Sequence, residues 1–253
     1  MKRGKVYFIG AGPGDPELIT VKGKKIIQKA DLVLYTGSLV PKDVVLTAKK
    51  GARVVDSSSM TLDEIHNTMM ETINNGGIVA RVHTGDPSIY GTLNEQIRLL
   101  EKEGVPYEII PGVTAAFALA AEAKISLTIP EVTQTVIFAR ISGKTYVPDR
   151  ERLKELSSHK ASLAIYLSAS NPSLVKKELI EGGYPEDTLV IIGYRVGWPD
   201  QKILKCELKD MDKVIKEEGI KRQAVFLIIP KAGDTASKLY DPEFEHGFRK
   251  RKK

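Results

Sequence analysis

Three short glycine-bearing loops contain the residues whose types and spacing could support chemistry. They read GAGPGD at 10–15, HTGDP at 83–87 and PGVT at 111–114, and each follows an apolar run typical of a buried β-strand. Open parallel sheets bind ligands outside the carboxyl ends of their strands, where glycine lets the backbone come close to a ligand. Three such loops at one sheet edge therefore predict a binding site for a small soluble cofactor.

The first loop does not match the common nucleotide-binding fingerprints. The dinucleotide pattern G-x-G-x-x-G requires a glycine where Asp15 stands, and an acid at the end of the second strand, where residues 34–38 contain none. The phosphate-binding pattern G-x-x-x-x-G-K-[ST] is absent from the chain. Pro13 removes an amide that a pyrophosphate would use, and Phe8 stands where the common methyltransferase fold has an acid. These departures disfavour NAD, ATP and that common fold.

A cationic sulfonium cofactor with an adenosyl group and an amino-acid tail fits these loops better. It needs hydrogen-bond partners for ribose and adenine and an apolar slot, but little phosphate binding. Asp86 could accept from a ribose hydroxyl, while Thr84 and Gly85 could supply backbone contacts. The pair Asp86-Pro87 is equally typical of a helix N-cap followed by proline, and Asp15-Pro16 has the same alternative.

The elements that must position these loops alternate between apolar strand-like runs and amphipathic helix-like runs. This alternation predicts parallel βαβ units, and hence an α/β fold of two lobes with mainly parallel sheets. The expected strands are 5–9, 31–36, 53–56, 78–83 and 107–110, followed by 135–140, 163–168, 189–194 and 224–230. We place the N-terminal lobe at 1–113, a connecting helix and linker at 114–134, the C-terminal lobe at 135–240 and a disordered basic tail at 241–253.

The helix after the third expected strand has a clear beginning and end. Thr61 and Glu64 match a capping box, in which each side chain accepts from the other residue's backbone amide. Gly76-Gly77 is expected to end the helix. Its apolar stripe at helical spacing consists of Leu62, Ile65, Met69 and Ile73.

The composition predicts a soluble globular protein of the cytoplasm. Hydrophobic residues make up 42% and charged residues 28%, and no apolar run is long enough to span a membrane. The N-terminus lacks a signal-peptide pattern, and the single cysteine, Cys206, excludes an internal disulfide and a cysteine-based zinc site. Residues 249–253 supply five of the six net positive charges, which leaves 6 − 5 = +1 for the body. That balance does not favour a nucleic-acid partner.

The chain closely resembles the tetrapyrrole methylases, which use S-adenosylmethionine in the synthesis of vitamin B12 and sirohaem. The resemblance spans residues 5–230, nearly the whole chain. The segments that carry it are 10–16, 18–20, 30–35, 83–91, 111–115, 133–135, 198–200 and Ala224. Within this family, 35–40 and 57–64 resemble the members that methylate C11 of precorrin-4 or cobalt-precorrin-4.

The resemblance implies a class III S-adenosylmethionine methyltransferase fold, with the cofactor in a cleft between the lobes, and a homodimer. It implies methylation of a tetrapyrrole, with S-adenosylhomocysteine as the product of the cofactor. The cofactor contacts carried over residue by residue are Pro13, Thr84, Gly85, Asp86, Ile89, Thr114, Ala115, Leu167, Val196 and Ala224. Asp56 and residues 57–60 follow the third expected strand, and we expect Ser58, Met60 and Tyr90 to contact the substrate.

One position departs from the family pattern. Related uroporphyrinogen methylases carry an acid, proposed as a base, in the loop after the second strand, where this chain has Gly37. The catalytic base is therefore unassigned, and the departure argues against uroporphyrinogen as the substrate. A strand-end histidine such as His83 is more typical of a structural donor. Methyl transfer from a sulfonium needs no metal and no covalent nucleophile, so we expect no metal ligands.

Several points stay open at this level. The same fold could act at another precorrin position, on ribosomal RNA or in diphthamide synthesis, or could bind the cofactor without catalysis. Whether cobalt is already in the substrate is also undecided. The substrate carboxylates predict basic partners, because guanidinium and ammonium groups pair well with carboxylates. Candidates near strand ends are Arg53, Arg81, Arg140 and Arg195.

Overall fold

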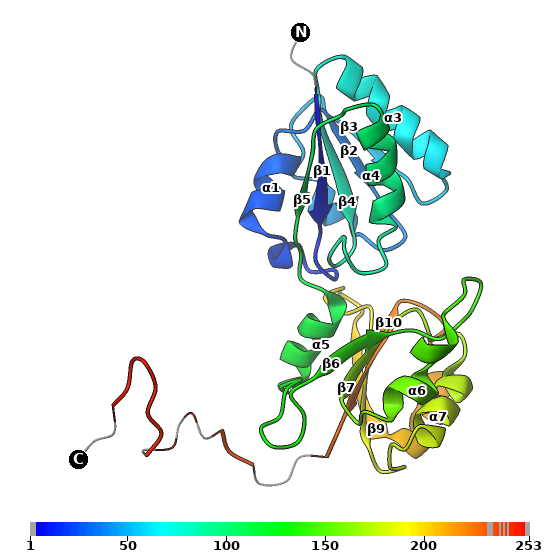
Figure 1. Ribbon diagram of the computed structural model, residues 1–253. Helices are drawn as coiled ribbons and strands as arrows, with labels where there is room; N and C mark the ends of the chain where they lie inside the picture. The colour runs from blue at the N-terminus through cyan, green and yellow to red at the C-terminus, as the bar shows by residue number, and fades with distance from the viewer. Residues whose placement is uncertain (1–3, 232–234, 238, 240, 242, 251–253) are drawn as a thin grey trace. The chain divides into compact units, whose positions relative to one another are not determined.

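The computed structural model describes residues 4–231, 235–237, 239, 241 and 243–250 (Figure 1). The chain divides into two compact units, the first containing Met1–Ala118 and Arg195–Gln201, the second Leu119–Tyr194 and Lys202–Lys253. Each unit contains one five-stranded sheet. The loop 195–201 is thus distant in sequence from the rest of the unit to which it belongs.

The first unit alternates strands and helices, as the sequence pattern predicts. Its elements are β1 (Lys5–Gly10), a 3-10 turn (Pro16–Leu18), α1 (Val21–Ile27), β2 (Leu32–Tyr35), α2 (Lys42–Val45), β3 (Arg53–Asp56), α3 (Leu62–Asn74), β4 (Ile78–His83), α4 (Leu93–Lys102) and β5 (Tyr107–Ile110). Helix α5 (Ala115–Ala123) begins in the first unit and ends in the second.

The sheet of the first unit is parallel throughout, with the order β3-β2-β4-β1-β5. The register pairs Gly10 of β1 with His83 of β4, and Tyr35 of β2 with Asp56 of β3. The carboxyl ends of neighbouring strands are therefore level, and the loops that follow them share one edge. This edge is where an open parallel sheet binds ligands.

Helices cover both faces of this sheet (Figure 1). Side chains of α3 and α4 pack with alternate residues of β1, β2 and β4 in one buried cluster, which includes Met69, Leu100 and Phe8. Side chains of α1 and α2 pack on the opposite face, in a second cluster that includes Ile27 and Val45. Because both faces are buried, the inner strands β1, β2 and β4 are largely apolar, as the sequence predicts.

The capping box of α3 is confirmed. The Thr61 hydroxyl accepts from the Glu64 amide at 3.3 Å, and the Glu64 carboxylate accepts from the Thr61 amide at 2.7 Å. Of the expected stripe, Ile65, Met69 and Ile73 are buried, whereas Leu62 in the first turn is 40% exposed. The helix is thus held by its last three stripe positions and by its cap.

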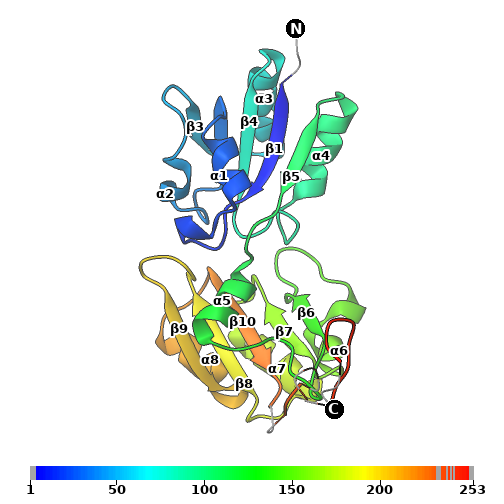
Figure 2. The same cartoon turned by 90° about the vertical axis from the view of Figure 1, so that its left-hand side faces the viewer.

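The sheet of the second unit is mixed, with the order β6-β7-β10-β8-β9 (Figure 2). Its elements are β6 (Val136–Ala139), a 3-10 turn (Asp149–Glu151), α6 (Leu153–Ser157), β7 (Ser162–Ile165), α7 (Pro172–Glu181), β8 (Leu189–Tyr194), β9 (Lys202–Glu207), a 3-10 turn (Leu208–Asp210), α8 (Met211–Glu217) and β10 (Ala224–Ile229). Only β6 and β7 pair in parallel, while the other three pairs are antiparallel. Our expectation of parallel units was therefore wrong for most of this sheet.

Strand β9 explains part of that difference. It was not among the expected strands, because KILKCE interrupts its apolar residues with charged ones that lie exposed at an edge of the sheet. It follows β8 after the seven residues 195–201, and a connection this short allows only an antiparallel pair. The nine strands expected from the sequence are all present, with ends that differ by up to three residues.

Beyond β10, His246 and Arg249 form an isolated antiparallel bridge. Of the tail expected at 241–253, residues 241 and 243–250 are described, and Pro242 and 251–253 lie outside the described part. Within it, Arg249 donates to the backbone carbonyls of Asp241 and Phe244. No helix in the described part of the chain has the length and apolar character needed to cross a membrane.

Candidate active site at the carboxyl edge of the first sheet

The three glycine-bearing loops meet at the carboxyl edge of the first sheet. Gly12 and Gly85 exchange backbone hydrogen bonds of 3.2 and 2.8 Å, and the Ala11 amide donates to the His83 carbonyl at 2.8 Å. The third loop joins them because the Gly112 amide donates to Asp86 Oδ2 at 2.8 Å. The structure thus brings together the loops after β1, β4 and β5, which are three neighbouring strands.

The glycines in these loops are needed mainly for contacts between the loops. A Cβ on Gly112 would lie 2.2 Å from the Gly85 carbonyl oxygen, and a Cβ on Gly10 would lie 2.6 Å from the Gly112 Cα. Gly85 itself has a φ of +59°, which glycine adopts without strain. The sequence predicts that these glycines allow close approach by a ligand, and the structure shows that close approach of backbone to backbone already requires Gly10 and Gly112.

Asp86 joins two of the loops through its carboxylate. Oδ2 accepts from Gly112, and Oδ1 accepts from the amide and hydroxyl of Ser88. Burial opposes ionisation, but the Ser88 and Gly112 hydrogen bonds outweigh it and hold the pKa of Asp86 below its ordinary value. The helix-cap alternative was wrong for Asp86, because helix α4 begins only at Leu93. It is confirmed for Asp15, which accepts from the Glu17 amide at 2.8 Å and caps a 3-10 turn.

The loop between β8 and β9 packs on the GAGPGD loop. A Cβ on Gly14 would lie 2.3 Å from Trp198 Cδ1, and Trp198 Nε1 donates to the Pro13 carbonyl at 3.2 Å. The guanidinium of Arg195 lies 3.9 Å from the Trp198 ring centroid, a cation–π distance. Val196, from the same loop, has its carbonyl 2.8 Å from the position of a Gly14 Cβ. Pro13 and Val196, both expected to contact the cofactor, are therefore near neighbours.

The other expected cofactor contacts are divided between the two units. Thr84, Ile89 and Ala115 are half-buried in the first unit, where Thr114 is buried just before α5. Leu167 and Ala224 belong to the second unit, the former after β7 and the latter at the start of β10. Contact of all ten residues with one cofactor therefore stays a prediction.

Four of the eight described non-glycine residues with left-handed backbone lie after the carboxyl end of a strand. Tyr90 (54°) and Thr92 (48°) follow β4, Leu167 (51°) follows β7, and Arg195 (47°) follows β8, whereas Lys124, Glu131, Lys160 and Gln223 lie elsewhere. Such conformations are uncommon outside glycine and often mark ligand-binding loops. Three of the four belong to segments in which the sequence predicts cofactor or substrate contacts.

Two buried polar side chains lie on the α3/α4 face of β4. Arg81 donates to Gln96 Oε1 at 3.0 Å, to the Leu34 carbonyl at 3.3 Å and to Ser57 Oγ at 2.8 Å. Burial lowers the pKa of Arg81 to about 10, and its hydrogen-bond partners named above are all uncharged. Burial, with the nearby Arg81 charge, lowers the pKa of His83 to about 3, so its imidazole is neutral. His83 Nε2 has no hydrogen-bond partner among the described residues, so the expected donor role is not seen at that atom.

The other arginines considered for substrate carboxylates are engaged within the protein. Arg53 pairs with Glu71 at 2.7 Å, and Arg195 pairs with Asp200 at 2.7 Å. Arg140 donates to the backbone carbonyls of residues 141, 145 and 146. A role for any of them in substrate binding stays a prediction.

The expected substrate residues follow β3 and β4. Ser58 is exposed and Met60 half-buried in the segment between β3 and α3, and Tyr90 is 43% exposed after β4. The same segment begins with Asp56, whose Oδ1 accepts from the amides of Gly37 at 2.9 Å and Ser58 at 2.8 Å. The sequence alone did not reveal this contact between the ends of β2 and β3.

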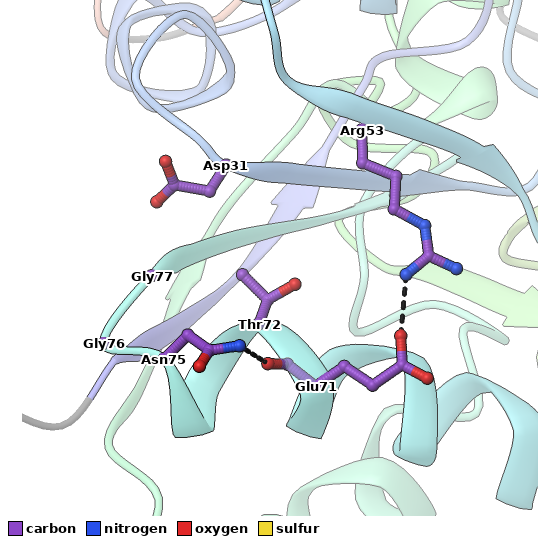
Figure 3. A pocket seen from close by; sticks show the side chains of 7 residues that line it. All are labelled: Asp31, Arg53, Glu71, Thr72, Asn75, Gly76 and Gly77. Atoms are coloured by element: carbon purple, nitrogen blue, oxygen red, sulfur yellow. Dashed lines mark hydrogen bonds and ion pairs between the residues drawn. The ribbon is translucent and has the colours of Figure 1, made fainter.

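A polar hollow of about 570 Å³ lies at the opposite, amino edge of the first sheet (Figure 3). It is bordered by Asp31 just before β2, Arg53 at the start of β3 and Gly77 just before β4. Its charged groups are paired, Arg53 with Glu71 and Asp31 with Lys49. The described residues contain no cluster of three or more histidine, cysteine, aspartate or glutamate side chains suited to a metal ion.

A parallel sheet that carries its chemistry in loops at the carboxyl edge, followed by a mixed sheet, defines a two-unit α/β enzyme fold. The chain belongs to the tetrapyrrole (corrin/porphyrin) methylases, whose family model matches residues 5–212. It is 49% identical to the cobalt-precorrin-4 C(11)-methyltransferase of Priestia megaterium, over 97% of this chain and 98% of that protein.

Solved structures show the same relationship. The X-ray structure of a cobalt-precorrin-4 methyltransferase of cobalamin biosynthesis matches with a TM-score of 0.87 and 49% identity, over 89% of this chain and 94% of that chain. A uroporphyrin-III C-methyltransferase from Thermus thermophilus, solved in complex with S-adenosylhomocysteine, matches with a TM-score of 0.73 and 25% identity. That match covers 89% of this chain and 97% of the other. The expected fold class is thereby confirmed.

Proposed function

We propose that this protein is an S-adenosylmethionine-dependent methyltransferase that adds a methyl group to C11 of a precorrin-4 in cobalamin synthesis. The observation that carries the proposal is the near-full-length 49% identity to a cobalt-precorrin-4 C(11)-methyltransferase. The matching solved structure is also a cobalt-precorrin-4 enzyme, so cobalt-precorrin-4 is the first substrate to test. Gly37, in the loop after β2, supports this choice over uroporphyrinogen.

The chemistry of the three loops fits a sulfonium cofactor. Residues 10–15, 83–90 and 110–115 contain no lysine or arginine, so they are poorly suited to bind a phosphate. They contain two carboxylates, Asp15 and Asp86, which are compatible with a positively charged ligand. The backbone between them is compact, because Gly10, Gly85 and Gly112 let the loops touch. S-adenosylmethionine, when bound, would supply an activated methyl group.

The residues of this chain would act mainly by binding and positioning. Asp86 would hold the loops after β4 and β5 together and would offer the cofactor's ribose an acceptor at its edge. Thr84, Gly85, Thr114 and Ala115 would contribute backbone and hydroxyl contacts. Positioning the acceptor carbon in line with an already activated methyl group supplies a large part of the rate enhancement in such a displacement.

We also propose that the protein is a cytoplasmic homodimer, as the family resemblance implies. Light scattering coupled to size-exclusion chromatography should then give twice the chain mass of 27.9 kDa. A particle with the mass of one chain at micromolar concentration would contradict the dimer without affecting the proposed reaction.

Two measurements test the proposed function. Calorimetry should show that one S-adenosylhomocysteine binds per chain. Purified protein with S-adenosylmethionine should then methylate cobalt-precorrin-4, and should leave uroporphyrinogen unchanged. Binding without turnover of any precorrin would favour a non-catalytic binding protein, and methylation of RNA or protein alone would favour another acceptor.

A further inference from the structure

The first sheet leaves one half of its carboxyl edge free of the glycine-bearing loops. These loops follow β4, β1 and β5, which are adjacent in the order β3-β2-β4-β1-β5. The ends of β2 and β3 make up the remaining half. If the glycine-bearing loops hold the methyl donor, the methyl acceptor must bind next to these loops. The carboxyl ends of β2 and β3 would then border the acceptor on one side.

Asp56 is the acidic residue of this half of the edge. The segment that follows β2 reads TGSLVP at 36–41, and the last residue of β3 with the segment after it reads DSSSMT at 56–61. Asp56 is the one ionisable side chain in these two stretches. The residue is exposed, so its carboxylate can meet a ligand. Asp86 and Asp15, in contrast, belong to the loops after β4 and β1 and cap turns there.

The Asp56 carboxylate is fixed against the β2 loop. The amides of Gly37 and Ser58 both donate to Oδ1, at 2.9 and 2.8 Å. A Cβ on residue 37 would lie 2.1 Å from Oδ2 and 2.5 Å from Cγ. Gly37 does not have a positive φ, so glycine is required here by the carboxylate and not by the backbone conformation.

The backbone at Asp56 is also held in place through the neighbouring residue, Ser57. The hydroxyl of the next residue, Ser57, donates to the Tyr35 carbonyl at 3.0 Å and accepts from buried Arg81 at 2.8 Å. Burial would raise the pKa of Asp56, but the Ser58 and Gly37 amides, the Ser58 hydroxyl and the Lys42 charge lower it on balance. The side chain is therefore a preorganised anion at neutral pH.

We propose that the Asp56 carboxylate faces the methyl acceptor and compensates the positive charge that the acceptor gains during methyl transfer. This inference rests on the proposed function. The acceptor carbon bonds to the methyl carbon with a π electron pair, while the sulfur–methyl bond breaks and its electron pair stays on sulfur. The charge of the sulfonium thus moves onto the acceptor, which later returns to its initial charge by releasing a proton to water.

A fixed anion beside the acceptor stabilises the positive charge that develops on the acceptor in the transition state more than it stabilises the acceptor in the starting state, which lacks that charge. Removing one preorganised charge or dipole that is aimed at a developing charge slows a reaction by about 100- to 1000-fold. A carboxylate with a lowered pKa is a weak base, so Asp56 acts through its charge and does not retain the proton. Neutralising the charge in place should therefore slow the transfer step and spare cofactor binding.

Asp56→Asn tests the charge directly. Asparagine keeps an oxygen that can accept from the Gly37 and Ser58 amides, but removes the negative charge. The expected result is a fall in kcat of about 100-fold at saturating cobalt-precorrin-4 and S-adenosylmethionine. The calorimetric affinity for S-adenosylhomocysteine should stay within about twofold, since one electrostatic group has been neutralised beyond the cofactor loops. Asp43→Asn, on the exposed surface of α2, is the matched control and should keep wild-type kcat.

Gly37→Ala tests the position of the carboxylate. The added methyl group must displace the end of the Asp56 side chain, while the backbone conformation remains allowed. It should lower kcat as Asp56→Asn does, again with cofactor affinity kept. The control is Gly143→Ala, because a Cβ at Gly143 meets nothing within 4 Å.

Two outcomes would overturn the inference. Wild-type kcat in both Asp56→Asn and Gly37→Ala would show that the carboxylate only joins two loops. A parallel loss of S-adenosylhomocysteine binding and of kcat would show that it acts through the cofactor site. Both outcomes differ from failure of the proposed function, in which the wild-type protein itself would not bind the cofactor or methylate the precorrin.

Discussion

At the scale of single residues, Asp86 has a structural role in addition to its expected contact with the cofactor's ribose. It accepts from the Gly112 amide and from Ser88, and so ties the loop after β4 to the loop after β5. A hydrogen bond to an ionised group contributes about 1.5–3 kcal/mol. The residue therefore matters for the shape of the site even before any contact with ribose is considered.

Asp86→Ala should weaken S-adenosylhomocysteine binding by about tenfold or more. Losing hydrogen bonds worth about 1.5–3 kcal/mol would leave the loops in their binding-competent conformation for a smaller fraction of the time. Calorimetry measures the affinity. Ser88→Ala is the control, since it removes the hydroxyl but leaves the Gly112 bond and the Ser88 amide in place. Equal affinity in wild type and Asp86→Ala would limit Asp86 to capping a turn.

His83 predicts a pH dependence of stability. In the unfolded chain its pKa is near the model value of 6.5, whereas in the folded protein burial lowers it to about 3. Between these values the unfolded chain binds one more proton, so the free energy of unfolding falls as the pH is lowered through this window. The effect is at most about 1.4 kcal/mol per pH unit and is absent above pH 6.5.

Urea unfolding of wild type and His83→Gln at pH 4, 5, 6 and 8, roughly spanning the window of histidine linkage, isolates this contribution. Carboxylates titrate in both proteins, so the comparison between the two is what matters. From pH 4 to 6 the wild-type free energy of unfolding should rise more steeply with pH than that of His83→Gln. The difference in slope should correspond to about one additional proton taken up on unfolding. Parallel curves would mean that the imidazole is already protonated in the folded protein.

At the scale of elements, the loop between β8 and β9 is a structural part of the first unit. Trp198 lies against Gly14 and donates to the Pro13 carbonyl, and it is the one tryptophan of the chain. Its fluorescence therefore reports on the loop that we expect to contact the cofactor. No labelling is needed to follow this contact.

Titration with S-adenosylhomocysteine should change the intensity or wavelength of the Trp198 emission. Gly14→Ala should shift the emission of the ligand-free protein to longer wavelength, because a Cβ at 2.3 Å from Cδ1 forces the indole out of its place. Free tryptophan titrated with the same ligand corrects for absorption by adenine. An unchanged spectrum in Gly14→Ala would contradict this packing.

Local sequence patterns predicted the elements of the first unit well. Its strands are largely apolar, and the Thr61–Glu64 capping box is a local signal that needs no tertiary context. Strand β9 gave no such signal, because its charged residues are tolerated only at a sheet edge. Strand β10 pairs antiparallel with β7 and β8, and this direction depends on how the chain connects the strands. The apolar residues of β10 do not reveal the direction of its pairing.

The candidate site was predictable to the extent that its residues lie in contiguous loops. The GAGPGD and HTGDP segments could be found by their spacing, and the parallel sheet explains why they meet. The contact of Asp56 with Gly37 joins residues 19 positions apart through the β2–β3 register. The contact of Trp198 with Pro13 joins residues 185 positions apart. Neither contact is encoded in a local pattern.

At the scale of the whole molecule, the fold and the family agree on a methyltransferase that acts on a large tetrapyrrole. The chain matches its cobalt-precorrin-4 relative over nearly its full length, and the described residues show no cluster suited to a metal ion. The central claim is the position at which the methyl group is added.

The most direct test locates that methyl group on the product. The protein would be incubated with cobalt-precorrin-4 and S-adenosylmethionine labelled with ¹³C in the methyl group, and the product examined by mass spectrometry and NMR. We predict one added methyl group, with its ¹³C signal coupled to C11. A methyl group at any other ring carbon, or a substrate recovered unchanged by protein that binds S-adenosylhomocysteine, would contradict the proposed function.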